Sequence, residues 1–299
     1  MTVKMENSDS DSSGYIENFL QFLKIQKNIS ENTLLAYRRD AGQFFLFLEK
    51  RGIGIKDADK IAVRDYLAQL SGGMKKSTVI RKIAVMRGLF GFIVRCKIIP
   101  SSPMDTIFSP KKDGYLPNFL TVEEVERLIS SAAAAEGAAG QRDWAILELL
   151  YSSGMRVSEL TGLNKGDVDF IAGCLKVTGK GSKQRIVPLG DKALGAVRKY
   201  LALRTDDTQA LFTGRKFSRI TPRCIQLMLK KYLRLAGIDR DITPHSLRHT
   251  FATHLLDAGC DIRSVQEMLG HKSITTTQIY THVTASRMKK IYDKVHPRS

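Results

Sequence analysis

The 299-residue sequence predicts a mainly α-helical protein with a small antiparallel β-sheet, divided into two domains. Up to about residue 99, apolar residues recur at helical spacing. Residues 100–118 lose that periodicity and contain four prolines, which is typical of a linker. In the second half, two short alternating runs joined by a glycine-rich turn indicate a hairpin.

The first domain, residues 14–99, is expected to be a bundle of four amphipathic helices with short loops. Residues 1–13 are polar and predict a flexible leader. The third helix should end at Ser71-Gly72-Gly73, because glycine disfavours a helix interior. The four helices are predicted at residues 16–23, from Ser30 through Phe47, at 62–70, and from Ser77 through Phe90.

The second domain, residues 119–299, is expected to be mixed α and β. It opens with Thr121-Val122-Glu123-Glu124, a capping box ahead of an apolar run. A helix over residues 144–151 should break at Gly154. Residues 174–177 and 185–189 alternate as strands, and the turn Thr178-Gly179-Lys180-Gly181-Ser182 joins them. The remainder is predicted to be mostly helical.

The charge points to a polyanionic partner. The formal net charge is +17, the isoelectric point is near 9.8, and both halves of the chain are basic. The four cysteines are far apart and predict isolated thiols in a reducing compartment. No apolar run reaches the length of a membrane helix, so we expect no membrane association and a cytoplasmic location.

Several residues together suit attack on a DNA phosphodiester. Arg156 and Arg248 offer planar guanidinium forks for two phosphate oxygens at once. His245, three residues before Arg248, shares its helix face and could accept the proton of Tyr280, the candidate nucleophile. Lys180, at the hairpin tip, could protonate the leaving 5′-oxygen. Taken alone, Arg156 is equally compatible with a surface role, and Lys180 and Tyr280 are more typical of a solvated turn and of packing; the set favours catalysis.

Other cations are predicted to contact DNA phosphates. On the helical domain they would form one phosphate-facing side, and on the hairpin they flank the general acid. The residues are Arg38, Arg39, Lys75, Lys76, Arg81, Lys82, Arg87, Lys183 and Arg185. Metal catalysis is disfavoured, because His245, His249 and His254 lack a Glu or Cys that would complete a zinc motif. We therefore expect no metal and no cofactor.

These residues resemble the signature of the tyrosine recombinases of the phage integrase type. Four stretches of the sequence around these residues also resemble the family: "LLYSSGMRVSELTGL", "VTGKGSKQRIVPLG", "TPHSLRHTFATHLLDAG" and "VQEMLGHKSITTTQIYTH". The N-terminal "SENTLLAYRRDAGQFFLFL" is similar to the family's core-binding helical domain, so the resemblance covers nearly the whole chain. Within the family the chain is most similar to the bacterial Xer recombinases, nearer the C than the D member.

The resemblance implies a fold and a role for each motif residue. It implies a SAM-like core-binding domain and an α+β catalytic domain that form a C-shaped clamp on DNA. Arg156, Arg248 and His271 would bind the scissile phosphate, and Glu159 would support the site. Lys180 would be the general acid, His245 the acid/base partner, and Tyr280 the nucleophile of a 3′-phosphotyrosyl intermediate.

The resemblance also implies partners. The chain would act on two double-stranded DNA recombination sites as a homo- or hetero-tetramer with a related recombinase, resolving chromosome dimers with the help of a septal DNA translocase. The segment from Ser286 to Val295 would pack onto a neighbouring subunit. Two alternatives stay open: a mobile-element integrase or resolvase with the same chemistry, and a protein that binds DNA without cutting it.

Overall fold

We describe a computed structural model of the chain, which covers residues 12–27, 29, 31–110, 119–179, 184–270, 289 and 291–298. The chain divides into two compact units, residues 1–115 and 116–299, called here the helical unit and the catalytic unit. Within the described residues, no helix is long and apolar enough to cross a membrane.

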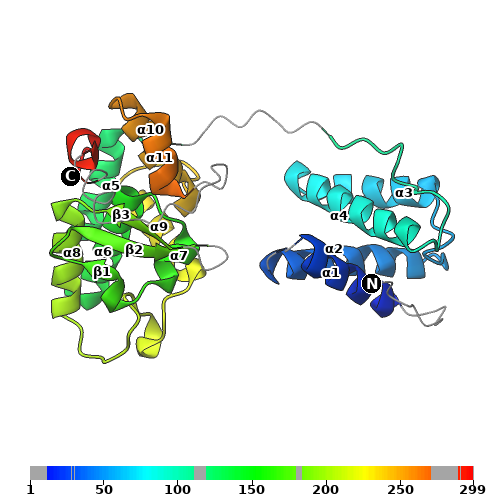
Figure 1. The fold of residues 1–299 in the computed structure, drawn as a ribbon, viewed down its shortest axis with the longest axis horizontal. Helices are drawn as coiled ribbons and strands as arrows, with labels where there is room; N and C mark the ends of the chain where they lie inside the picture. Colours follow the sequence, from blue (N-terminus) through cyan, green and yellow to red (C-terminus); the bar gives the residue numbers. More distant parts are fainter. Residues whose placement is uncertain are drawn as a thin grey trace. The chain divides into compact units, whose positions relative to one another are not determined.

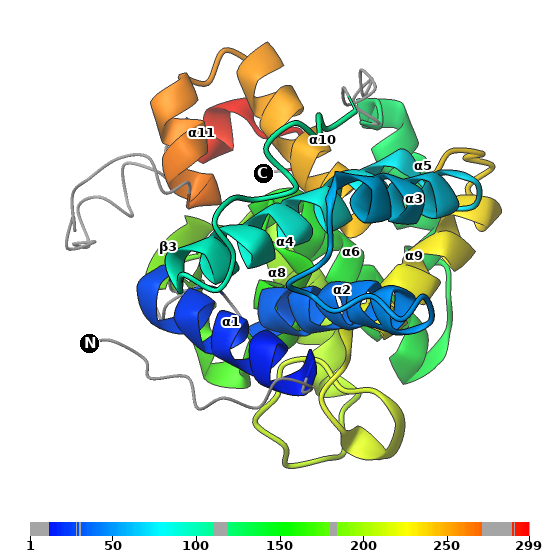
Figure 2. The ribbon, with the colours of Figure 1, turned by 90° about the vertical axis from the view of Figure 1, so that its right-hand side faces the viewer.

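In its described residues, the helical unit has four helices around an aromatic-rich core. Figures 1 and 2 show α2 and α4 lying side by side. Phe19, Phe44 and Phe90 are fully buried between the helices. The four-helix prediction is confirmed, with helices α1 (Ser12–Lys27), α2 (Glu31–Glu49), α3 (Lys60–Ser71) and α4 (Lys76–Arg95). Helix α3 begins earlier than predicted because Asp59 caps it, accepting a hydrogen bond from the Ala62 amide at 2.8 Å.

The residues after α4 do not all behave as a linker. Ile99, Met104 and Ile107 are buried in the core of the helical unit. Arg87 donates a hydrogen bond from Nη2 to the Ile107 carbonyl at 2.7 Å. The first part of the predicted 100–118 linker is thus folded onto α4, because its apolar side chains find space there despite the prolines. Residues 111–118 lie outside the described part of the chain.

The described part of the catalytic unit contains a three-stranded antiparallel sheet with the strand order β1-β2-β3. Strands β2 and β3 pair with Leu175 opposite Val187, which confirms the predicted hairpin strands; the turn residues 180–183 are outside the described residues. The elements are α5 (Val122–Ala133), α6 (Gly137–Ser153), α7 (Val157–Gly162), η1 (Lys165–Asp167), β1 (Val168–Asp169), β2 (Cys174–Thr178), β3 (Gln184–Pro188), α8 (Asp191–Ala202), η2 (Arg215–Phe217), α9 (Pro222–Leu235), α10 (Pro244–Asp257) and α11 (Ile262–Leu269).

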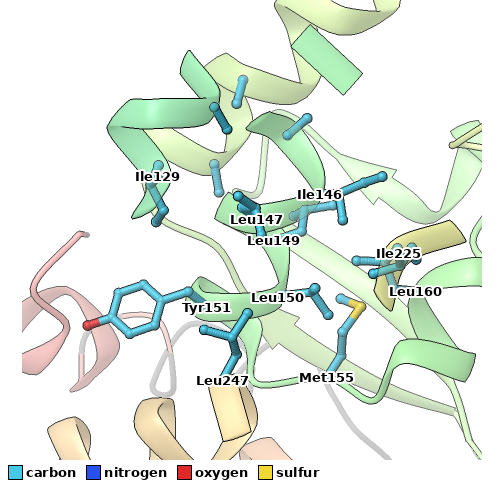
Figure 3. Packing of buried hydrophobic residues seen from close by; sticks show 14 of the residues in the cluster. Ile129, Ile146, Leu147, Leu149, Leu150, Tyr151, Met155, Leu160, Ile225 and Leu247 are labelled. Atoms are coloured by element: carbon cyan, nitrogen blue, oxygen red, sulfur yellow. The ribbon is translucent and has the colours of Figure 1, made fainter. Parts of the chain in front are cut away.

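Helix α6 is the centre of the catalytic unit. Every residue from Ala145 to Ser153 is buried, as expected of a helix packed on all sides. Figure 3 shows Leu147, Leu149 and Leu150 among the buried side chains of this core. The predicted capping box at the start of α5 is present, with Thr121 and Glu124 bonding each other's backbone amides.

The C-terminal segment, residues 291–298, packs onto its own catalytic unit. Tyr292 is fully buried and stacks on His296, with ring centroids 4.5 Å apart. Arg298 donates from Nε to Glu148 on α6 at 3.0 Å, and Tyr151 points toward this segment (Figure 3). The expectation that residues 286–295 pack onto a neighbouring subunit stays a prediction; within the chain itself, Tyr292 is buried, whereas Asp293 and Lys294 are exposed.

Candidate active site

Arg156 is placed by a sharp break between two helices. Helix α6 ends at Gly154, whose φ of 57° is left-handed, and Arg156 is the N-cap of α7. A Cβ on Gly154 would lie 2.3 Å from the Phe251 ring and 2.9 Å from Leu269. Glycine is needed here for both the backbone conformation and the close packing. The Arg156 side chain is 47% exposed, so it faces solvent next to this break.

Glu159 holds Arg156 in place from one turn into α7. The Arg156 backbone amide donates to Glu159 Oε2 at 2.8 Å, and Arg156 Nη1 donates to Oε1 at 3.0 Å. Burial acts to raise the pKa of Glu159, but hydrogen bonds from Arg185 and from the Arg156 amide outweigh it, so the pKa is lowered. The carboxylate is therefore ionised at neutral pH.

Arg185 is buried, although it was predicted to contact DNA phosphates. Its side chain on β3 is only 7% exposed, with Nη1 donating to Glu159 Oε1 at 3.0 Å and Nη2 to Oε2 at 2.9 Å. Its Nε donates to the Met268 carbonyl at 3.0 Å. The prediction that Arg185 contacts DNA phosphates is corrected, because a buried guanidinium forked onto a carboxylate is not available to DNA.

Arg248 and His245 come from the first turns of α10 and lie at different depths. Thr243 caps this helix and Pro244 follows at its first position. His245 is exposed, whereas Arg248 is buried and donates to the carbonyls of Gly154 at 2.8 Å and Leu269 at 2.7 Å. Burial, together with the charge of Arg156, lowers the pKa of Arg248 to about 10. Arg248 is still cationic at neutral pH.

Arg156, Glu159 and Arg185, with Arg248 beside them, form what we call the Glu159 cluster. The remaining predicted catalytic residues, Lys180, His271 and Tyr280, lie outside the described residues, as does Lys183. The chain enters the segment that carries His271 and Tyr280 from the end of α11. There Gly270 has a left-handed φ of 67° and donates its amide to the carbonyls of the last turn.

The predicted cations of the helical unit are only partly available. Arg39, Lys75 and Lys76 are exposed. Arg38 is exposed but forms an ion pair with Glu17 at 2.7 Å, and Arg87 donates a hydrogen bond to the Ile107 carbonyl.

Lys82 is a second correction: it was expected on the phosphate-facing side, yet its side chain is 3% exposed. Its Nζ bonds Asp40 Oδ1 at 3.0 Å and also Gln43, and Arg81 bonds the other Asp40 oxygen. Asp40, Gln43, Arg81 and Lys82 are called the Asp40 cluster below.

The predicted trio His245, His249 and His254 does not gather as a metal site. His254 is buried, and its Nδ1 lies 2.8 Å from the hydroxyl of Tyr151, while His245 and His249 are exposed. Among the residues that the structure describes, no group of three His, Cys, Asp or Glu side chains is arranged to hold a metal ion.

Comparison with known proteins decides the family. The family described as "Phage integrase family" matches residues 118–287, and "Phage integrase, N-terminal SAM-like domain" matches residues 16–97. The chain belongs to the phage integrase family. The two matches fall one in each unit of the structure.

Relatives of this integrase-family chain include Xer recombinases. It is 43% identical over 295 residues to "Tyrosine recombinase XerC" of Thermodesulfovibrio yellowstonii, covering 95% of this chain and 97% of the relative. It is 40% identical to "Tyrosine recombinase XerD" of Oceanobacillus iheyensis, covering 95% and 98%. In fold it matches a crystal structure of XerH site-specific recombinase bound to palindromic difH substrate, at 22% identity with a TM-score of 0.70, covering 97% and 98%.

The integrase-family chain thus presents an excess of positive charge at its Glu159 cluster. Three arginines face a single carboxylate, and the repulsion between Arg156 and Arg248 contributes to the lowered pKa of Arg248. An anion bound beside them would relieve that repulsion. Guanidinium groups are the side chains best suited to binding two oxygens of a phosphate.

Proposed function

We propose that this chain is a site-specific tyrosine recombinase that cuts and rejoins double-stranded DNA at a recombination site. The Tyr280 phenol oxygen attacks the scissile phosphorus, forming a 3′-phosphotyrosyl bond and breaking the bond to the 5′-oxygen. That oxygen takes a proton from Lys180 and leaves as a 5′-hydroxyl. The 5′-hydroxyl of a partner strand then attacks the phosphotyrosine and releases Tyr280.

The observation that carries this proposal is the surplus of arginine charge around Glu159. Attack on a phosphodiester builds negative charge on the non-bridging oxygens, and fixed cations stabilise that charge most when they are already in place. Arg156 and Arg248 are such cations, held by Glu159 and by backbone carbonyls. His271 would add a further donor, and His245 would exchange the proton of Tyr280.

The proposed biological role is resolution of chromosome dimers at a replication-terminus site before cell division, in the cytoplasm. The similarity to relatives named XerC and XerD supports this role. The chain would act as a homo- or hetero-tetramer on two DNA sites, with both units contributing DNA contacts. A related recombinase and a septal DNA translocase are its proposed partners.

Covalent capture tests the proposal. The protein, alone and with the second Xer-type recombinase of its source, is incubated in EDTA with fragmented chromosomal DNA from that source. Denatured protein–DNA adducts are then recovered and sequenced. We expect adducts in EDTA with the wild-type chain and none with Tyr280→Phe, which should still shift DNA in a gel. Adducts that persist in Tyr280→Phe, or none in either mixture, would overturn the proposal.

The positions of the recovered sequences test the biological role separately. Clustering at one site near the replication terminus supports dimer resolution. Clustering at the ends of mobile elements would replace that role with integration, while the chemistry stands.

A further inference from the structure

Arg185 is a buried cation to which the reaction above gives no part. It is on β3 and only 6% exposed. Its guanidinium makes three hydrogen bonds, two to Glu159 on α7 and one to the Met268 carbonyl on α11. One side chain thereby joins three elements that are far apart in the sequence. A buried arginine of this kind costs free energy unless each charge is matched, so its partners indicate what it is for.

Arg185 orients Glu159, the residue that holds Arg156. Glu159 uses the same two oxygens for Arg185 and for Arg156, with all four distances between 2.8 and 3.0 Å. The fork of Arg185 fixes the plane of the carboxylate, and the carboxylate fixes both the backbone amide and the Nη1 group of Arg156. Without that fork, a carboxylate that is 4% exposed would be free to turn away from Arg156.

Arg185 also acts together with Arg248 at the end of α11. Arg185 bonds the Met268 carbonyl and Arg248 bonds the Leu269 carbonyl, two consecutive groups that the helix itself leaves unpaired. Gly270 lies directly against Arg185: a Cβ there would be 3.1 Å from Cδ and 3.3 Å from Nε and Nη1. The position from which the chain continues to His271 and Tyr280 is therefore set by two arginines.

We propose that Arg185 is a positioning residue for strand cleavage, which aligns Arg156 through Glu159 and fixes the end of α11 ahead of His271 and Tyr280. The inference rests on the proposed function, since it concerns how Arg156 meets the scissile phosphate. Arg185 itself touches no DNA in this scheme.

The test compares Arg185→Met and Arg185→Lys with a matched control. Arg204 is also a buried arginine of the catalytic unit, paired with Asp206, and none of its hydrogen bonds reaches a proposed catalytic residue. Single-turnover cleavage is measured on a nicked duplex built from the captured sequence, alongside gel-shift affinity and thermal midpoint. Arg204→Met should lower the thermal midpoint but leave cleavage at low temperature unchanged.

For Arg185→Met we expect cleavage slowed about 100-fold, because a misplacement of about 1 Å costs that much. Affinity for the duplex should change by less than about threefold, since a transition-state interaction is lost without loss of ground-state binding. Arg185→Lys should recover part of the rate, because an ammonium satisfies one Glu159 oxygen but not the fork.

A second substrate separates positioning from simple loss of structure. In a duplex whose scissile phosphate is a neutral methylphosphonate, the alignment of Arg156 on a charged oxygen matters less. The rate penalty of Arg185→Met should shrink by about tenfold or more on this duplex. An equal penalty on both duplexes, or wild-type cleavage by Arg185→Met, would overturn the inference alone. Absence of any adduct with the wild-type chain would instead overturn the proposed function, and this inference with it.

Discussion

Asp40 in the helical unit and Glu159 in the catalytic unit are both buried carboxylates, each held by two cationic side chains. Asp40 bonds Lys82 at 3.0 Å and also Arg81, while Glu159 bonds Arg185 at 2.9 Å and Arg156 at 3.0 Å. In each trio one cation is buried and the other is about half exposed, with Arg81 at 43% and Arg156 at 47%. Composition and burial alone do not distinguish them.

The two clusters differ in what they attach. The bonds of Asp40 join side chains of α2 and α4, so they fasten one helix to another. Glu159 also accepts a backbone amide, and its partner Arg185 reaches the end of α11. Arg248 adds a further cation with a lowered pKa. Surplus charge at the ends of elements, and not a buried ion pair as such, therefore marks the candidate site.

The largest difference between the two clusters is expected when the half-exposed arginine of each one is replaced. Arg156→Gln should slow single-turnover cleavage by about a thousandfold, as loss of one donor to a developing oxyanion does. Arg81→Gln, equally exposed, should leave the rate at saturating DNA unchanged. Equal slowing in both variants would show that the clusters are not functionally distinct.

The structural role of the Asp40 cluster predicts a stability effect. Lys82→Met should destabilise the helical unit by about 3 kcal/mol, because Asp40 loses its buried partner. The double variant Asp40→Leu/Lys82→Met should recover most of that loss, since no uncompensated charge stays buried. Hydrogen exchange of the α2 and α4 amides in the full chain measures both. A double variant as unstable as the single one would contradict this explanation.

His296 extends the comparison to a buried group that carries no charge. Burial lowers its pKa to about 3, so the folded protein keeps it neutral, whereas the unfolded chain takes up a proton near its ordinary pKa of 6.5. Its contribution to stability is complete above pH 6.5 and falls as the pH drops toward 3, by up to about 1.4 kcal/mol per pH unit.

Calorimetry from pH 7 to 5 measures this effect. His296 faces Tyr151, Tyr292 and Phe251, and the charges of His254, Arg298 and Lys192 also act on it. His296→Phe keeps the ring stacking but removes the titrating group, so its thermal midpoint should fall less steeply with pH. Parallel curves for the two proteins would rule out His296 as the source.

The smallest effects are expected at the exposed cations of the helical unit. Arg39→Gln and Lys75→Gln should each reduce the slope of log affinity against log salt by about 0.9, the value for one phosphate contact. Arg38→Gln should do less, since Arg38 already pairs with Glu17. Gel shifts over a series of salt concentrations measure this, and an unchanged slope for Arg39→Gln would remove that residue from the DNA-facing surface.

Local signals in the sequence predicted much of the fold. The Thr121 capping box, the strands around the hairpin and the break at Gly154 depend on a few adjacent residues, and all are present. The prediction of a linker over residues 100–118 did not anticipate that its first part packs on the helical unit, because prolines indicate a lack of regular structure and not a lack of packing. Met104 and Ile107 are buried in an irregular segment, which periodicity does not detect.

The burial of Lys82 and Arg185, which were predicted to contact DNA, could have been predicted from their positions in the sequence pattern. Lys82 follows Val79 by three residues and precedes Met86 by four, so it falls on the buried stripe of α4. Arg185 shares a strand face with Val187, which is also buried. Helical and strand phase therefore predict burial at both positions. The partners Asp40 and Glu159 could not be predicted in this way, because they are distant in sequence and come from other elements.

The docked C-terminal segment gives the protein a built-in optical reporter. Trp144 is the sole tryptophan of the chain. Its indole Nε1 donates to Glu148 Oε1 at 3.1 Å, and the other oxygen of that carboxylate accepts from Arg298 at 3.0 Å. If the C-terminal segment detaches, Glu148 loses its cation and the indole loses a fixed neighbour. We therefore expect the intrinsic fluorescence of the unlabelled protein to change when its C-terminal segment detaches from Glu148.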